Sequence, residues 1–142
     1  MIILDTNVLS AVMRSEPEAR VIAWLDMQAA ESIWITSITL FEARLGIALL
    51  PNGRRRQALE AAFTRLLAED LENRVLDFDI DAAEEAARLA ASRQKAGKPI
   101  EVRDTLIAGI ALSRRATIAT RNLRDFRDLD VPVVNPWEEG RP

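Results

Sequence analysis

Short apolar runs separate longer segments in which apolar residues recur at helical spacing. The first run, Met1–Leu4, is apolar throughout and predicts a strand that is buried on both faces. Similar runs predict further strands at residues 33–35, 75–76, 117–119 and 131–134. Strands this short, alternating with helices, are typical of a mainly parallel sheet covered by helices.

The segments between the strands predict the helices. Apolar spacing, cap residues and Gly or Pro breaks place them near residues 6–13, from Pro17 onward, after Thr36 or Ser37, at 54–68, from Asp79 or Asp81 to Gly97, and at 104–113. The alanine-rich helix before Gly97 is expected to run through Ile80, Ala83, Ala87, Ala90 and Ala91. Gly109, in the middle of a predicted helix, is expected to allow close helix packing.

These elements predict a three-layer α/β/α sandwich. Its sheet would be short, mainly parallel and built from four or five strands. The chain of 142 residues matches the usual size of one domain, and no internal repeat or linker interrupts it. We therefore expect a single domain over residues 1–142.

Composition restricts the chemistry. The chain has no His and no Cys, which excludes Ser-His-Asp and Cys-His nucleophiles, Cys/His zinc sites and disulfides. Carboxylates, hydroxyls, amides and Arg remain, and carboxylates with hydroxyls are ligands that suit Mg²⁺ or Mn²⁺. No apolar run reaches the ~18 residues that span a bilayer. A cytoplasmic protein with no membrane association is expected, and its net charge of −3 confines any nucleic-acid contact to a local surface.

Four positions are expected to meet at one edge of the sheet, because ligands bind beyond the carboxyl ends of parallel strands. Asp5 ends the first strand, and Thr120–Asn122 follow the strand at 117–119. Asp104 begins the helix that leads into that strand, and Glu42 lies in the helix after the second strand.

Each acid also has a purely structural interpretation. Asp5 and Asp104 suit helix N-caps, and Thr39 with Glu42 matches a capping box. Thr36 or Ser37 would cap the same helix equally well and leave Glu42 free. Arg103 is expected to point away from Asp104, so an ion pair between these neighbours is not predicted.

The residues after the strand at 117–119 leave alternatives open. Asn122 is better placed for the site than Asp125, which lies about one turn further on and would otherwise cap a helix or pair with Arg121 or Arg124. Arg121 is the cation closest to the predicted site. The run Arg54–Arg56 is more typical of a solvated face than of a phosphate-binding surface.

The ordered set of motifs resembles the PIN-domain family over the whole chain. It consists of Asp5-Thr6-Asn7, Thr36-Ser37 followed by Glu42, Arg103 to Ala108, Thr120-Arg121-Asn122 and the closing Val133 to Trp137. Within that family, the chain is most similar to the VapC toxins and their FitB-like group.

The resemblance implies a Mg²⁺-dependent ribonuclease that is the toxin of a type II toxin–antitoxin pair. It implies that Asp5 and Asp104 hold the metal, with Mn²⁺ as a substitute, and that Glu42 is a further catalytic acid. Thr6 and Thr120 match supporting polar positions. Asn122 stands where the family often has a fourth acid, so its amide removes one charge that Asp125 would restore.

The resemblance also implies partners. These are an RNA substrate, a small DNA-binding antitoxin, and a second copy of the chain in a homodimer or a higher toxin–antitoxin assembly. Two other functions are compatible with the residues. One is a phosphatase with Asp5 as nucleophile, which lacks the partner acid because residue 7 is Asn. The other is a binding module without catalysis.

Overall fold

The strands form one parallel sheet in a computed structural model that describes residues 1–139. The last three residues of the expected domain lie outside the described residues. The strands are β1 (Ile2–Leu4), β2 (Ile33–Thr36), β3 (Val75–Leu76), β4 (Thr117–Ala119) and β5 (Val133–Val134). Their order is β3-β2-β1-β4-β5, and every neighbouring pair is parallel. The predicted parallel sheet is confirmed, with five strands.

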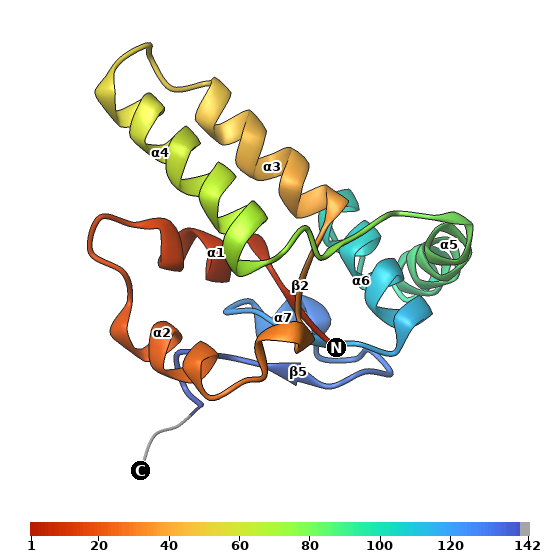
Figure 1. Cartoon of the computed structure of the whole chain (residues 1–142). Helices are drawn as coiled ribbons and strands as arrows, with labels where there is room; N and C mark the ends of the chain where they lie inside the picture. The colour runs from red at the N-terminus through yellow and green to blue at the C-terminus, as the bar shows by residue number, and fades with distance from the viewer. Residues whose placement is uncertain (140–142) are drawn as a thin grey trace.

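Helices connect and cover these strands (Figure 1). They are α1 (Thr6–Met13), α2 (Ala19–Asp26), α3 (Ser37–Ala48), α4 (Arg54–Arg65), α5 (Ile80–Lys95), α6 (Val102–Arg114) and α7 (Leu123–Phe126), with a 3₁₀ turn η1 (Ala30–Ser32) and a π-helical turn η2 (Leu66–Asp70). The expected helix at 54–68 is therefore α4 followed by η2, and the short α7 was not predicted. The last strand is shorter than the predicted 131–134.

The core lies on both faces of the sheet. One cluster joins Ile3 of β1 and Ile118 of β4 to α5, α6 and α7. On the opposite face, Leu4 and Ile35 pack with Val8 of α1 and with α2. Neighbouring residues of β1 thus point to opposite layers, because side chains alternate along a strand. The predicted three-layer α/β/α sandwich is confirmed.

The chain reverses direction across the sheet at β1. It moves from β1 to β2 and β3 on one side, and then returns to β4 and β5 on the other. The carboxyl ends of β1 and β4 therefore flank a topological switch point, the usual ligand site of a parallel sheet. Asp5 follows β1 and Thr120 follows β4, so both residues lie at this point.

The helices α5 and α6 pack closely. Gly109 of α6 lies against α5, where an added Cβ would come within 2.6 Å of the Ala82 carbonyl oxygen and 2.7 Å of the Ala86 Cβ. The predicted role of Gly109 is thus confirmed. The predicted alanine-rich helix is confirmed as α5, and its buried residues are Ala82 and Ala86. Five other apolar residues of this helix are exposed: Ile80, Ala83, Ala87, Ala90 and Ala91.

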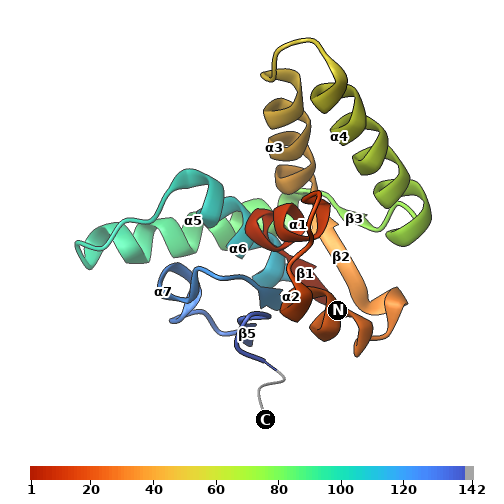
Figure 2. The ribbon, with the colours of Figure 1, turned by 90° about the vertical axis from the view of Figure 1, so that its left-hand side faces the viewer.

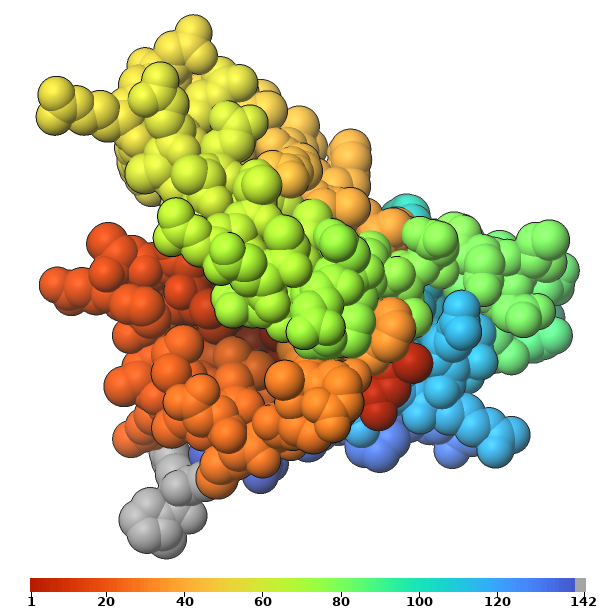
Figure 3. Space-filling view, in the orientation of Figure 1, coloured from red at the N-terminus to blue at the C-terminus, as the bar shows by residue number. Residues whose placement is uncertain are grey.

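The helices α3 and α4 project from the sandwich as an antiparallel pair (Figures 2 and 3). A third apolar cluster, in which Ile47 of α3 and Phe63 of α4 meet Leu9 of α1, holds the pair against α1. Phe41 and Leu49 of α3 are large apolar residues that remain 63% and 75% exposed. Phe41 is therefore not in the core of this chain.

Within residues 1–139, no helix combines the length and the apolar character that a bilayer span requires.

Candidate active site

Asp5 is buried at the carboxyl end of β1 and caps α1. Its side chain is 1% exposed, and its Oδ1 accepts hydrogen bonds from the Thr6 amide at 2.8 Å and from Arg103 Nη2 at 2.9 Å. Its Oδ2 accepts from the Thr120 hydroxyl at 2.8 Å and more weakly from the Asn7 amide at 3.4 Å. The capping role and the predicted place in the site therefore coexist, because Oδ1 accepts from both the capping amide and Arg103 while Oδ2 accepts from Thr120 and Asn7.

Asp104 is a second buried carboxylate, with a side chain 2% exposed, in the first turn of α6. It does not cap the helix, which begins at Val102 because the Glu101 carbonyl accepts from the Thr105 amide. Burial raises the pKa of Asp104 to about 6, Arg103 opposes this rise, and the acids Asp5 and Asp125 add to it.

Glu42 reaches the same region from α3. Thr36 caps this helix by accepting from the Thr39 amide at 3.1 Å, so the alternative capping box between Thr39 and Glu42 is not needed. The Thr6 hydroxyl donates to Glu42 Oε1 at 2.7 Å. Glu42 is 24% exposed and is thus the most accessible of the three acids.

Arg103 joins the three carboxylates. Its Nη2, Nε and Nη1 donate to Asp5, Glu42 and Asp104 respectively. Burial alone would lower the pKa of Arg103, but these partners raise it above its ordinary value. The expectation that Arg103 points away from Asp104 is wrong. Helical spacing predicts the direction of the Cα–Cβ bond, whereas a long guanidinium stem bends back toward its neighbour.

Asp125 and Asn122 lie on the Asp104 side of the site. Asp125 is within hydrogen-bonding reach of Asp104 and contributes to its raised pKa. The Asn122 side-chain amide donates to Asp125 Oδ2 at 2.7 Å, and its backbone amide donates to the Thr120 hydroxyl at 3.0 Å. The structure thus places the acid of Asp125 against Asp104, with Asn122 holding it.

The remaining predicted residues differ in their distance from the acids. Thr6 and Thr120 contact Glu42 and Asp5 directly. The Arg121 guanidinium lies 4.7 Å from the centre of the Trp137 ring, and only the backbone amide of Arg121 donates to the Asn7 side chain. Arg121 is therefore at the rim rather than among the carboxylates.

Asn7 and Arg103 are site residues that the sequence did not reveal. The Asn7 amide also donates to the Thr120 hydroxyl at 3.3 Å, so it links the ends of β1 and β4. Its position in Asp5-Thr6-Asn7 was the available signal. For Arg103, the signal was its place directly before the candidate metal ligand Asp104.

The donor chemistry of this acidic cluster, defined as Asp5, Glu42 and Asp104, fits a hard divalent cation. Two of its carboxylates are almost completely buried, and such groups require a counter-charge. Among residues 1–139, no three acidic side chains converge closely enough to coordinate one ion directly. The Arg103 guanidinium lies between the three and supplies the counter-charge in this arrangement.

A family comparison identifies the fold. The PIN domain model matches residues 2–132. The chain belongs to the PIN-domain family. Its expected similarity to VapC and FitB toxins is also confirmed. It is 43% identical to the plasmid stability protein StbB of Pseudomonas syringae pv. tomato, over 97% of this chain and 99% of that protein. It is 38% identical to the VapC ribonuclease Y4jK of Sinorhizobium fredii, with the same coverage.

A solved PIN-domain structure agrees with these relatives. It is described as FitAB bound to an IR36 DNA fragment and superposes with a TM-score of 0.90 at 38% identity, covering 99% of each chain. The similarity therefore extends over the sandwich and the projecting helices of this PIN domain together.

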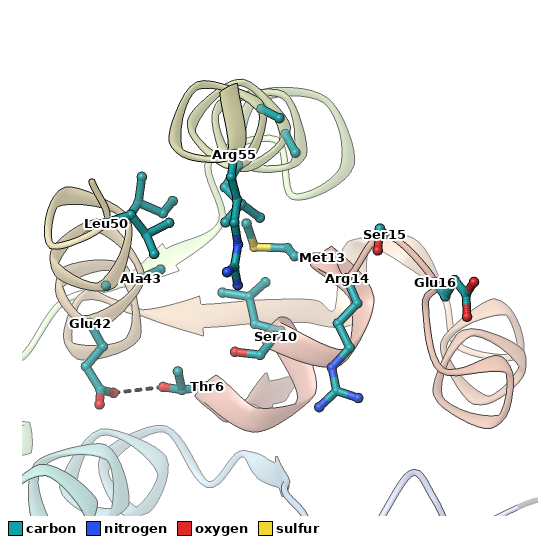
Figure 4. Close-up of a pocket in the computed structure, with 16 residues that line it drawn as sticks. Thr6, Ser10, Met13, Arg14, Ser15, Glu16, Glu42, Ala43, Leu50 and Arg55 are labelled. Atoms are coloured by element: carbon teal, nitrogen blue, oxygen red, sulfur yellow. Dashed lines mark hydrogen bonds between the residues drawn. The ribbon is translucent and has the colours of Figure 1, made fainter. Parts of the chain in front are cut away.

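A groove begins beside the acidic cluster of this PIN domain. It has a volume of about 1090 Å³ and lies between α1, α3 and α4. Glu42 and Thr6 form one end, and Arg55 points from α4 into the space above Ser10 (Figure 4). Small or apolar residues line much of the rest: Leu9, Met13, Ala43, Gly46, Ile47, Leu50, Ala58, Leu59 and Ala62.

Proposed function

We propose that this PIN domain is a Mg²⁺-dependent endoribonuclease and the toxin of a type II toxin–antitoxin pair. One observation carries the proposal. Carboxylates from three separate elements, Asp5 after β1, Glu42 on α3 and Asp104 on α6, meet on one guanidinium at the switch point of the sheet. A fold belonging to a family with ribonuclease members supports the reaction class.

The acids have different roles because their surroundings differ. The buried Asp5 and Asp104 would hold the cation. Thr120 would fix the orientation of Asp5, and Asp125 would fix that of Asp104. Glu42 is more exposed, so it would accept a proton from the water that attacks the phosphodiester. The Thr6 hydroxyl donates to Glu42 Oε1, whereas Arg103 contacts Oε2, so Thr6 orients the carboxylate for proton transfer.

Bound Mg²⁺, or Mn²⁺ in its place, would supply Lewis acidity and charge neutralisation at the phosphodiester. A cluster of carboxylates would otherwise repel the RNA backbone. We therefore expect the reaction to depend on the cation and on both buried acids.

The aspartyl-phosphatase alternative gains no support. Both oxygens of Asp5 accept hydrogen bonds, which lowers their nucleophilicity. Residue 7, where that mechanism would place a second acid, is an Asn that donates to Asp5.

The groove between α1, α3 and α4 is the surface we assign to the antitoxin. Its apolar lining suits an amphipathic segment of a partner, and Arg55 and Glu42 would fix the polar ends. The similar FitAB structure contains a toxin-family chain in a complex on DNA, which supports a small DNA-binding antitoxin. A partner in this groove would lie beside Glu42 and would limit access to the acids.

We further propose that this chain forms a homodimer. Binding of antitoxin to the homodimer would build a higher toxin–antitoxin assembly. The exposed apolar side chains of α3, namely Phe41, Leu45 and Leu49, recur every four residues and form one stripe. A second copy covering this stripe would remove it from water. A protein that cleaves RNA and binds a DNA-binding antitoxin would act in the cytoplasm, and we propose that location.

The test is cleavage of labelled RNA by the purified chain, with Mg²⁺ and with excess EDTA. Cleavage should require the cation and should be lost in Asp5→Asn and Asp104→Asn. Brief expression in bacteria should arrest growth, and the RNA ends should map to phosphodiester cleavage.

Two outcomes would overturn the proposal. Equal cleavage in EDTA would exclude metal dependence. Growth arrest that persists in both Asn variants, with no RNA cleavage, would instead support the non-catalytic binding module.

A further inference from the structure

The guanidinium of Arg103 has no role in the proposed reaction, yet it occupies the centre of the acidic cluster. Each of three nitrogens donates to a different acid, and these acids come from β1, α3 and α6 in turn. The fork of an Arg side chain suits this task because its donors point in fixed and separate directions. Removing it would leave two buried carboxylates facing each other without a nearby cation.

A divalent cation and Arg103 need the same oxygens. Arg103 donates to Oδ1 of Asp5 and to Oδ1 of Asp104. Each oxygen of Asp5 also has a fixed donor at 2.8 Å, the Thr6 amide for Oδ1 and the Thr120 hydroxyl for Oδ2, so the position of Arg103 on Oδ1 is the one that a ligand can take. Like charges also repel at this short range. Binding of Arg103 and binding of a cation at the cluster therefore exclude each other.

Arg103 has room to leave, whereas the acids do not. Its side chain is 29% exposed, compared with 1% for Asp5 and 2% for Asp104. It lies in the first turn of α6, beside the exposed Glu101 and Val102. Rotation of its long stem would move the guanidinium to the surface without moving the helix.

We propose that Arg103 is an internal counter-ion that competes with the divalent cation for the acidic cluster. It holds the three acids together in the metal-free protein and must be displaced when the metal binds. The inference rests on the proposed function, since it takes the cluster as the metal site. Arg103 is thus a positioning residue whose contacts weaken metal binding while they stabilise the metal-free fold.

The test measures metal binding without RNA. Isothermal titration with MnCl₂ and with MgCl₂ compares the wild type, Arg103→Gln, Arg103→Lys and a control, Arg65→Gln. Arg65 is exposed on α4 and has no ion pair or side-chain hydrogen bond within the described residues, so its substitution removes the same charge elsewhere. The Lys variant keeps the charge, but its single ammonium group spans fewer carboxylates.

We expect Arg103→Gln to bind Mn²⁺ at least tenfold more tightly than the wild type. Arg103→Lys should lie between the two, and Arg65→Gln should match the wild type. In EDTA, Arg103→Gln should unfold at a lower temperature than the wild type, and Mn²⁺ should raise its Tm by a larger amount. If the role of Arg103 were purely structural, Arg103→Gln would lower both the stability of the protein and its affinity for the metal.

A second measurement uses the wild type alone, in case Arg103→Gln does not fold. The Nε–Hε signal of Arg103, assigned by its loss in Arg103→Lys, should exchange slowly with water in EDTA. Titration with Mg²⁺ should make this exchange fast as the guanidinium leaves Glu42. An Nε–Hε signal that stays protected at saturating Mg²⁺ would overturn the inference.

The failures are distinguishable. If the wild type binds the cation and Arg103→Gln binds it equally or more weakly, the inference is wrong and the proposed metal site remains. If no variant binds a cation and RNA cleavage continues in EDTA, the proposed function is wrong, and the inference fails with it.

Discussion

Two helix pairs flank the acidic cluster and differ in how they are held. The α5–α6 pair packs directly on the sheet, and Gly109 brings the two helices into backbone contact. The α3–α4 pair packs on α1 through a smaller apolar cluster, and it leaves a groove and the exposed Phe41 and Leu49 along its length. The first pair supplies the buried Asp104, and the second supplies the more accessible Glu42.

This difference separates the tasks of the acids. A cation ligand must keep its position, so a carboxylate on a closely packed helix suits that role. A residue that exchanges protons with water must be reached by water, which suits Glu42. The groove is also on the α3–α4 side, so a partner bound there would affect Glu42 before it affected Asp104.

Substitutions of the acids on the two helix pairs should differ most in their effect on the rate of RNA cleavage. Asp104→Asn should reduce the rate of RNA cleavage by more than about 100-fold, since loss of groups that merely support a metal ligand already costs about 10–100-fold. Glu42→Gln should cost less, because other bases and water can accept the proton. Single-turnover cleavage of a labelled RNA at saturating Mg²⁺ measures both.

The matched control is Asp128→Asn, an exposed acid of the same type. It should retain the wild-type rate. If Glu42→Gln proved more damaging than Asp104→Asn, the assignment of ligand and proton acceptor would have to be exchanged.

Stability should also distinguish the pairs. Gly109→Ala should destabilise the protein by about 1–3 kcal/mol, because its new Cβ overlaps the backbone of α5. Gly46→Ala on α3 meets no atom within 4 Å and should stabilise by up to about 1 kcal/mol through helix propensity. Chemical denaturation of both variants in EDTA tests this. Equal effects would mean that the α5–α6 contact is not as close as described.

The sequence predicted the sheet edge better than the side chains that fill it. Apolar runs and cap residues located all five strands, and the carboxyl-end rule placed Asp5, Glu42 and Asp104 together. These features depend on local periodicity and on general properties of parallel sheets. A single chain therefore displays them without knowledge of tertiary contacts.

Tertiary contacts decided the rest. The sequence does not predict the buried face of α5 because alanines occur all around that helix, and the position of Gly109 on α6 selects Ala82 and Ala86. Arg103 was missed because its partners lie on β1 and α3 as well as on its own helix. The contact between Asp125 and Asp104 likewise depends on how the unpredicted α7 folds back.

Antitoxin binding should change only on substitution of residues in the α3–α4 pair. Ala58→Arg would place a large cation in the groove and should weaken antitoxin binding at least tenfold, or about 1.4 kcal/mol. RNA cleavage by the free toxin should be unchanged. Ala61→Arg, on the same helix and also exposed, is the control and should bind normally. Surface plasmon resonance with the cognate antitoxin measures both variants.

The smallest expected effect is a pH dependence of protein stability that arises from Asp104, on the α5–α6 side. The pKa of Asp104 is raised from 3.8 to about 6, so the folded state takes up a proton before the unfolded state as the pH falls. Metal-free wild type should therefore gain stability relative to Asp104→Asn between pH 6.5 and 5.5. The gain should be below about 1 kcal/mol, because one proton contributes at most about 1.4 kcal/mol per pH unit.

Urea unfolding in EDTA at these two pH values measures the difference. A gain that is equal in Asp104→Asn would assign the effect to another group.

The brevity of the outer strands limits how this protein can associate. The sheet ends in β3 and β5, and each contributes only two residues. Such edges present little free backbone for an additional strand, which is the usual route to edge-to-edge aggregation and to peptide binding by strand addition. Recognition by this chain is therefore left to helical surfaces, where side chains rather than backbone hydrogen bonds determine the partner. Specificity can then change through a few substitutions on α3 or α4 while the sheet stays the same.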